Sequence, residues 1–330
     1  MTSLDQHLLD TIQDAFPLEE RPYKVLAEQL DSDEQSVFEA VESLRNSGVI
    51  RRIGGVYDSK KLGFISRLCA GKVFDIDKFA AAVNEIPAIT HNYVRSHEYN
   101  VWFTVIAESE DEIRKIVDGL CASTDLHDVH VLSATKKFKI NTVMGKMLDE
   151  RRVILSDPCK GESKDPGPRS TQTCVLSLSD RARISIACTD IPHTLTPFKD
   201  WGVSTEELRD DLAKKRMRRF GAVLRHQDAG FAYNAMVCFG LDERRGSTGS
   251  PTEARDERGI VLAQKPYISH CYERPAFEGF PYSLYAMMHA QSAAELEKCI
   301  EEAALSIGNP DYAVLHSVRE LKKTSFRFFA

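Results

Sequence analysis

The sequence lacks the features that define several common classes of protein. Its eight cysteines include no Cys-x-x-Cys pair, the usual signature of thiolate zinc sites and of thioredoxin-type redox chemistry. No run approaches the roughly 20 apolar residues that a membrane span requires, and no cationic start precedes an apolar run at the N-terminus. We therefore expect no membrane partner, no secretory signal and a cytoplasmic location. A net charge of −6 over 330 residues argues against nucleic acid as the main partner, because phosphate backbones normally require a basic face.

The sequence does contain an internal repeat. Residues 51–64 (RRIGGVYDSKKLGF) match residues 218–231 (RRFGAVLRHQDAGF) without a gap, and residues 90–95 (THNYVR) match residues 269–274 (SHCYER). Two matches in the same order predict a duplicated chain, which would form an internal pseudo-dimer. A segment rich in proline, glycine and charge separates the halves and predicts a linker over 146–171.

Each half is predicted to hold a winged helix-turn-helix followed by a ferredoxin-like β-α-β-β-α-β domain, so the fold class is α+β. The winged domains are expected over 1–64 and 172–231, and the ferredoxin-like domains over 65–145 and 232–330. Three helices and a hairpin should form the first winged domain, with Ser32 and Gln35 as the capping box of its third helix. Ser204 and Glu207 repeat this box in the second half.

The ferredoxin-like domains are predicted from alternating hydrophobicity. In the first half we expect strands over 65–74, 89–97, 101–107 and 129–137, with helices over 76–86 and 111–122. In the second half we expect strands over 232–241, 267–274, 282–290 and 312–319, a helix over 293–307, and a solvated polar loop inserted at 242–251.

The candidate recognition helix carries the wrong charge for DNA. Residues 31–46 contain five acidic side chains against Arg45 alone, a local charge of −4 that a duplex would repel. In the second half, acidic residues stand at the start of the equivalent helix, where base contacts would be made. We therefore interpret the helical modules as scaffold and dimer contact, with a DNA-binding regulator as the alternative.

One strand of each half carries a set of side chains that could perform chemistry. The sets are His91, Tyr93 and Arg95 in the first half, and His270, Tyr272 and Arg274 in the second half. A period of two places each set on one face of its sheet. Such a face suits a flat anionic molecule, because arginine binds carboxylates, tyrosine stacks, and histidine transfers protons or ligates iron. The alternative is a hydrogen-bonded polar patch at a dimer interface.

The two halves also differ. His97 occurs only in the first half, whereas Arg225 and His226 occur only in the second. This asymmetry predicts a single productive site per chain, served by residues of both halves. The other histidines are expected to be surface or core residues: His7, His127, His130, His193, His289 and His316.

Residues 51–64, 91–103, 218–231 and 269–285 together resemble the sirohaem (siroheme) decarboxylases. These proteins are relatives of the Lrp/AsnC regulators in which the helix-turn-helix no longer serves DNA. The family commonly uses two separate subunits, and this chain resembles both subunit types fused.

The resemblance implies removal of two acetate carboxyls from sirohaem, giving 12,18-didecarboxysirohaem and CO2 in haem or modified-haem biosynthesis. It implies no cofactor beyond the iron that sirohaem carries, and a histidine could ligate that iron. Candidate proton donors are His91, His97, His226 and His270. Candidate substrate-binding residues are Arg51, Arg52, Tyr93, Arg95, Arg218, Arg219, Arg225, Tyr272 and Arg274. The alternatives are an Lrp/AsnC-like transcription regulator and a non-catalytic tetrapyrrole-binding protein.

Overall fold

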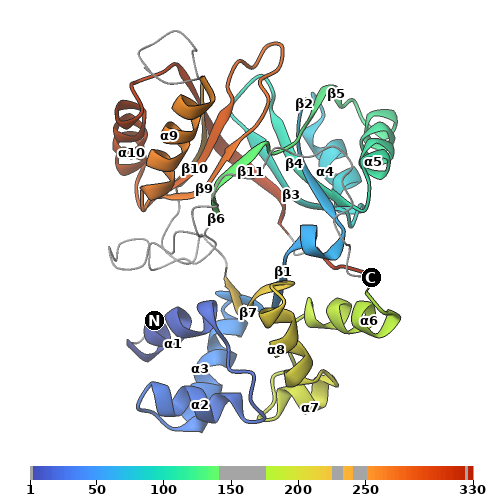
Figure 1. Cartoon of the computed structure of the whole chain (residues 1–330), viewed down its shortest axis with the longest axis vertical. Helices are drawn as coiled ribbons and strands as arrows, with labels where there is room; N and C mark the ends of the chain where they lie inside the picture. The colour runs from blue at the N-terminus through green and yellow to red at the C-terminus, as the bar shows by residue number, and fades with distance from the viewer. Residues whose placement is uncertain (1–2, 141–175, 225–232, 241–250, 324–325, 330) are drawn as a thin grey trace.

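The structure, a computed structural model, describes residues 3–140, 176–224, 233–240, 251–323 and 326–329. These residues form a helical module and a β-rich body, which follow one another along the longest axis of the chain (Figure 1). The linker predicted over 146–171 lies outside the described residues.

The helical module takes three helices and one strand from each half. The first half supplies α1 (Ser3–Asp14), α2 (Pro22–Gln29), α3 (Glu34–Asn46) and β1 (Ile50–Tyr57). The second half supplies α6 (Leu178–Ala187), α7 (Pro197–Trp201), α8 (Thr205–Ala213) and β7 (Met217–Leu224). One apolar core runs through both sets of helices and includes Leu8, Ile53, Ile184 and Phe220, so the two halves fold as one module.

The capping predictions had different outcomes. Ser204 caps α8 by accepting the backbone N–H of Glu207, which is one of the two hydrogen bonds of the predicted capping box. The predicted cap at Ser32 is wrong, because the side chain of Asp33 accepts the N–H of Ser36 at 2.9 Å and caps α3 instead. The backbone N–H of Ser32 still donates to an oxygen at the end of α2, so Ser32 closes that helix rather than opening the next.

The hairpin predicted for the first winged domain is also wrong. Among the described residues each half contributes one wing strand, and β1 pairs antiparallel with β7 of the other half, with Gly54 opposite Gly221. A Cβ atom at Gly54 would collide with the backbone oxygen of Thr189, and one at Gly221 with that of Ile12. Glycine at both positions therefore lets the wing sheet lie directly on the helices.

The β-rich body contains two ferredoxin-like domains. The first comprises β2 (Ile65–Lys72), α4 (Ile76–Asn84), β3 (Ile89–Arg95), β4 (Val101–Ala107), α5 (Glu110–Ser123) and β5 (His127–Leu132), preceded by the 3-10 helix η1 (Ser59–Leu62). The second comprises β8 (Tyr233–Phe239), α9 (Pro251–Gln264), β9 (Ile268–Glu273), β10 (Leu284–Ala290), α10 (Ala293–Ser306) and β11 (Tyr312–Lys323). The strand order is β5-β2-β4-β3 in one domain and β11-β8-β10-β9 in the other, which is the same order in both copies.

Each half completes the sheet of the other. The start of β11 pairs with β8, and its end, Ser317–Lys323, crosses to pair with β3 of the first half. In return, β6 (Lys136–Ile140) leaves the first half and pairs with β9. The single strand predicted over 129–137 is therefore two strands, and β11 extends beyond the predicted end at 319.

The polar insertion of the second half contains a helix that periodicity did not predict. Residues 241–250 lie outside the described residues, but α9 begins at Pro251, which was assigned to the loop. This helix takes the place that α4 has in the first half, so it completes the second β-α-β-β-α-β unit.

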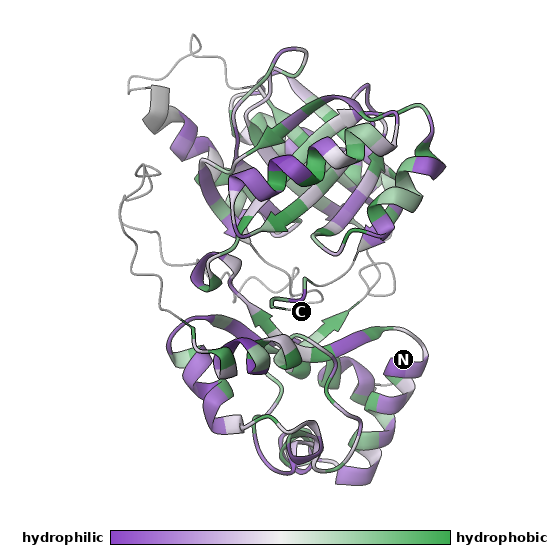
Figure 2. Cartoon of the chain, turned by 90° about the vertical axis from the view of Figure 1, so that its right-hand side faces the viewer, coloured by the Kyte–Doolittle hydropathy of each residue, from purple (hydrophilic) through white to green (hydrophobic). Residues whose placement is uncertain are grey.

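The two sheets face one another, and their helices cover the outer faces (Figure 1). An apolar cluster fills the space between the sheets, with Trp102, Cys238, Phe280, Tyr285 and Leu315 at its centre. Separate clusters lie beneath the helices of each domain. Polar residues mark the outward faces of the helices (Figure 2). Among the described helices, none has the length and apolar character that crossing a bilayer demands.

Candidate active site between the two sheets

In the first half, the structure brings Tyr93 and Arg95 together. The Arg95 guanidinium lies 4.8 Å from the centroid of the Tyr93 ring. It donates to the backbone oxygen of Leu315 at 3.3 Å and to Oγ of Ser317 at 2.6 Å, so it reaches the strand that crosses from the second half.

In the second half, three side chains form a continuous row. The Arg274 guanidinium lies 5.2 Å from the centroid of the Tyr272 ring, and that ring stacks on His270 with centroids 6.1 Å apart. Arg274 donates to the backbone oxygen of Leu132 at 2.8 Å, the counterpart of the bond from Arg95 to Leu315.

Neither guanidinium has an acidic partner among the described residues. Arg95 is buried, Arg274 is partly buried, and the Nε atom of each is shielded from solvent without a hydrogen-bond acceptor. Burial lowers the pKa of both groups, because a desolvated cation without a carboxylate is unfavourable. Arg95 donates to Leu315 and Arg274 donates to Leu132, and both leucines belong to the apolar cluster between the sheets, so the two arginines converge on one region.

Further cations gather beside Tyr272. Arg218 of the wing strand donates to the Asp58 carboxylate at 3.0 Å. Burial raises the pKa of the Tyr272 hydroxyl, and the positive charges of Arg274 and Arg218 oppose that rise. Lys137 of β6 pairs with Tyr272, and burial followed by the charge of Arg218 lowers the pKa of its amine. This corner therefore collects three positive side chains around one tyrosine and one carboxylate.

The equivalent corner of the first half differs in sign. Glu320 of β11 pairs with Tyr93, at the position that Lys137 holds beside Tyr272. Burial raises the pKa of the Tyr93 hydroxyl, the Glu320 charge adds to that rise, and Arg95 and Arg51 oppose it. Arg51 is exposed on β1.

Two of the predicted arginines lie inside the helical module. Arg219 donates to the backbone oxygens of Gln13 and Ala222, and Arg52 donates to that of Gly55. Burial lowers the pKa of Arg219 to about 10 and also lowers that of Arg52. Both side chains hold the wing sheet in place by contacts with the backbone.

The predicted histidines do not all lie together. His91 is exposed near the start of β3, with its Nδ1 2.9 Å from Oγ1 of Thr90. His97 follows the other end of that strand: about 13 Å of strand separates His91 from Arg95 at the usual rise per residue, and His97 lies in the turn after Arg95. There its Nδ1 accepts the N–H of Tyr99 at 3.1 Å, its ring packs against Phe280, and burial lowers its pKa. Arg225 and His226 lie outside the described residues.

Sequence reasoning missed two neighbours of the second set. His289 was expected to be an ordinary surface or core residue, but its Nε2 lies 2.8 Å from Oγ of Ser269, next to His270. Lys137 was not among the predicted site residues, and the strand predicted over 129–137 did not separate β6 from β5. The pairing of β6 with β9, which joins segments far apart in the sequence, reveals the position of Lys137. The pairing of β9 with the next strand, β10, reveals the position of His289.

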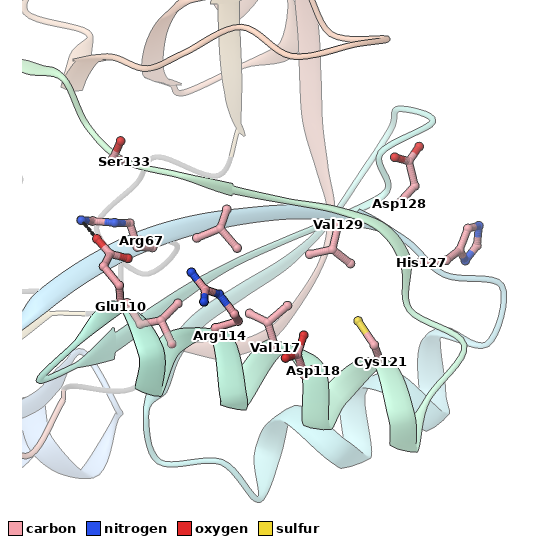
Figure 3. Close-up of a pocket in the computed structure, with 12 residues that line it drawn as sticks. Arg67, Glu110, Arg114, Val117, Asp118, Cys121, His127, Asp128, Val129 and Ser133 are labelled. Carbon is pink, nitrogen blue, oxygen red and sulfur yellow. Dashed lines mark hydrogen bonds and ion pairs between the residues drawn. The ribbon is translucent and has the colours of Figure 1, made fainter.

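The pocket drawn in Figure 3 lies elsewhere, along α5 and the edge strand β5, with a volume of about 670 Å³. Arg67 and Glu110 form an ion pair at one end, and Cys121 and His127 line the other. None of the predicted site residues lines it. The part of the chain that the structure describes holds no group of three or more histidine, cysteine or acidic side chains arranged for a metal ion.

Comparison with known proteins agrees with this architecture. A family model for the AsnC-like ligand binding domain matches residues 61–139 and 228–322. A model for the siroheme decarboxylase NirDL-like HTH domain matches residues 5–51. The chain is thus a duplicated protein of the Lrp/AsnC-like class, as predicted.

Individual relatives narrow the assignment. The chain is 32% identical to a siroheme decarboxylase from Hydrogenobacter thermophilus over 98% of this chain and 94% of that protein. It is 48% identical to the siroheme decarboxylase alpha subunit of Desulfovibrio desulfuricans, over 42% of this chain and 82% of that subunit. The crystal structure of the siroheme decarboxylase NirDL in co-complex with an iron-uroporphyrin III analogue matches with a TM-score of 0.66 at 27% identity, covering 100% of this chain and 95% of that one. The chain belongs to the siroheme decarboxylase family, a family of decarboxylating enzymes, as its sequence predicts.

Proposed function

We propose that this chain decarboxylates sirohaem, removing two acetate carboxyls to give 12,18-didecarboxysirohaem and CO2. The observation that carries the proposal is the pair of guanidiniums of Arg95 and Arg274, which both reach the apolar cluster between the sheets and have no acidic partner among the described residues. Desolvated cations of this kind are stabilised when a ligand supplies carboxylates. Tyr93 and Tyr272 add flat surfaces beside them, as a tetrapyrrole requires.

The reaction needs an orienting cation and an acid. In each step the bond between the acetate methylene and its carboxyl breaks, and CO2 leaves. The electron pair passes to the carbon attached to the pyrrole ring, where a proton completes a methyl group. No electrons are exchanged with an outside oxidant or reductant. An arginine holds the carboxylate, and an imidazole supplies the proton.

The second half offers the more complete set for this chemistry. His270, Tyr272 and Arg274 lie in one row, and Lys137 and Arg218 add positive charge beside them. The first half offers Arg95 and Tyr93, but Glu320 stands in the place of Lys137. This difference supports one productive site per chain, centred on the second set and sharing the space between the sheets with Arg95.

Anaerobic incubation of the whole chain with sirohaem, followed by mass analysis of the tetrapyrrole, tests the proposal. We expect a product that has lost two molecules of CO2, formed without added cofactor, and none with heat-denatured protein. Tight binding with an unchanged tetrapyrrole mass would instead identify a non-catalytic carrier.

A further inference from the structure

We propose that His289 is a positioning residue, which acts through Ser269 to hold His270 in the form that donates a proton to the substrate. This inference rests on the proposed function, because it assigns the proton donor of that reaction. It also explains why only one of the two repeated histidines has this role.

The three side chains form a hydrogen-bonded chain between adjacent strands. Oγ of Ser269 on β9 lies 2.9 Å from Nδ1 of His270 and 2.8 Å from Nε2 of His289 on β10. The hydroxyl also lies within hydrogen-bond distance of the backbone oxygen of Met287, at 3.4 Å. Ser269 is 1% exposed and His289 6% exposed, so water does not compete for the hydroxyl.

A single hydroxyl proton couples the two imidazoles. If Ser269 donates to Nε2 of His289, its oxygen must accept the proton on Nδ1 of His270. When His270 is protonated on both nitrogens it can then release a proton only from Nε2, which leaves the neutral ring with its proton on Nδ1, and its bond to Ser269 keeps the same direction before and after the transfer. The site therefore needs no rearrangement at the moment of reaction, which is the condition for efficient general acid catalysis.

The first half lacks this device. Thr90 presents its hydroxyl to Nδ1 of His91 at 2.9 Å, as Ser269 does to His270. His91 pairs with Thr104 of β4, and His270 pairs with Met287 of β10. Two residues further along these partner strands stand Ile106 in the first half and His289 in the second. An isoleucine cannot accept a hydrogen bond, so the tautomer of His91 is not fixed in this way.

Two substitutions of nearly equal shape separate the hydroxyl from packing. Ser269→Thr keeps the hydroxyl, and the threonine at position 90 shows that the fold accepts this side chain there. Ser269→Val introduces a side chain with the shape of threonine but without the hydroxyl. We expect Ser269→Val and His289→Phe to lower kcat roughly 10- to 100-fold with a change in KM below about threefold, and Ser269→Thr to stay within about threefold of the parent. His193→Gln, at a half-buried histidine of the helical module, controls for a general effect of losing an imidazole.

A second measurement does not depend on turnover. Nitrogen NMR of histidine-labelled whole chain reports which ring nitrogen of His270 carries the proton. We expect the proton on Nδ1 in the parent and in Ser269→Thr, and a mixture of tautomers in Ser269→Val. An unchanged tautomer in Ser269→Val, or equal losses of kcat in the threonine and valine variants, would overturn the proposal. If the parent releases no CO2, the proposed function fails, and the NMR result alone decides whether the hydrogen-bonded chain exists.

Discussion

Lys137 and Glu320 hold equivalent places in the two halves and carry opposite charges. Lys137 lies opposite Tyr272 across the β6–β9 pair, and Glu320 lies opposite Tyr93 across the β11–β3 pair. The first half therefore supplies, on β6, the positive charge beside Tyr272 of the second half. The second half supplies, on β11, the negative charge beside Tyr93 of the first half.

Reversing the charge at Lys137 tests this difference. We expect Lys137→Glu to weaken binding of an iron porphyrin polycarboxylate by at least about tenfold, or about 1.4 kcal/mol, because it replaces a favourable charge with a repulsive one. Spectroscopic titration measures the affinity and the stoichiometry, which we expect to be one per chain. Lys136→Glu is the matched control, since Lys136 pairs with Asp256 of α9 on the opposite face of β6. Equal losses in the two variants would remove the special role of Lys137.

Replacing Arg274 should separate binding from stability. Arg274→Met keeps the length of the side chain but removes a desolvated charge that has no acidic partner in the described structure. We expect the free energy of unfolding of the ligand-free chain to change by less than about 1 kcal/mol, while affinity for the iron porphyrin falls about 100-fold. Denaturant unfolding and titration give the two values. A large loss of stability with unchanged affinity would make Arg274 a structural residue.

The helical module should not bind DNA specifically. The acidic side chains of α3 remain at the surface, and its one cation, Arg45, donates two hydrogen bonds at 3.1 Å to the Asp190 carboxylate of the second half. A gel-shift assay near physiological salt should show no sequence-dependent complex at nanomolar protein. Such a complex would restore the regulator as an explanation of the fold.

Asp211 should be the most sensitive polar position of the helical module. Its fully buried carboxylate accepts hydrogen bonds from Arg183, Arg216 and Tyr57. We expect Asp211→Asn to lower the free energy of unfolding by about 3–5 kcal/mol, because two buried guanidiniums each lose the one counter-charge that is itself fully buried. Asp210→Asn, at the neighbouring acid that is partly open to solvent, should cost less than about 1 kcal/mol in the same denaturation assay. Similar losses at the two positions would falsify this assignment.

Lys139 should make stability depend on pH in the alkaline range. Burial lowers the pKa of its amine to about 8, from an ordinary value of 10.5. The unfolded state therefore binds more protons between these values, so the unfavourable effect of Lys139 is complete below about pH 8 and disappears as the pH rises to about 10.5. Lys139→Met should be more stable than the parent at neutral pH, with an advantage that shrinks over this range. Lys139→Arg, which stays charged, should show no such narrowing when denaturation midpoints are compared.

The order of helices and strands could be predicted because local patterns determine it. Alternating side chains identified β2, β3 and β4, and the repeated segments showed that the chain contains two copies. The helix α9 was missed because its first residues are polar and follow a long charged loop, so no apolar stripe marks its start. Tertiary packing against β9 and β6, through Leu262 among others, stabilises it instead.

The composition of the site could be predicted only in part. The period of two placed Tyr93 beside Arg95, and Tyr272 beside Arg274, within one strand each. His289 follows from the register of β10 on the neighbouring strand β9, which strand order alone does not give. Lys137 follows from the pairing of β6 with the distant strand β9, which no local pattern specifies. The wing pairing of β1 with β7 was missed for the same reason, since the strand partner lies more than 150 residues away.

The exchange of β6 and β11 between the halves bears on how such an enzyme assembles one copy of each unlike half. Two identical halves could interlock in the same way, but they would place two lysines or two glutamates at the equivalent positions beside the tyrosines. Because one chain encodes both halves, the correct pairing is an intramolecular event, and its yield does not depend on protein concentration. A single continuous chain thus fixes a one-to-one ratio of the unlike halves. Separate subunits would reach the same ratio only if each bound the unlike partner in preference to its own copy.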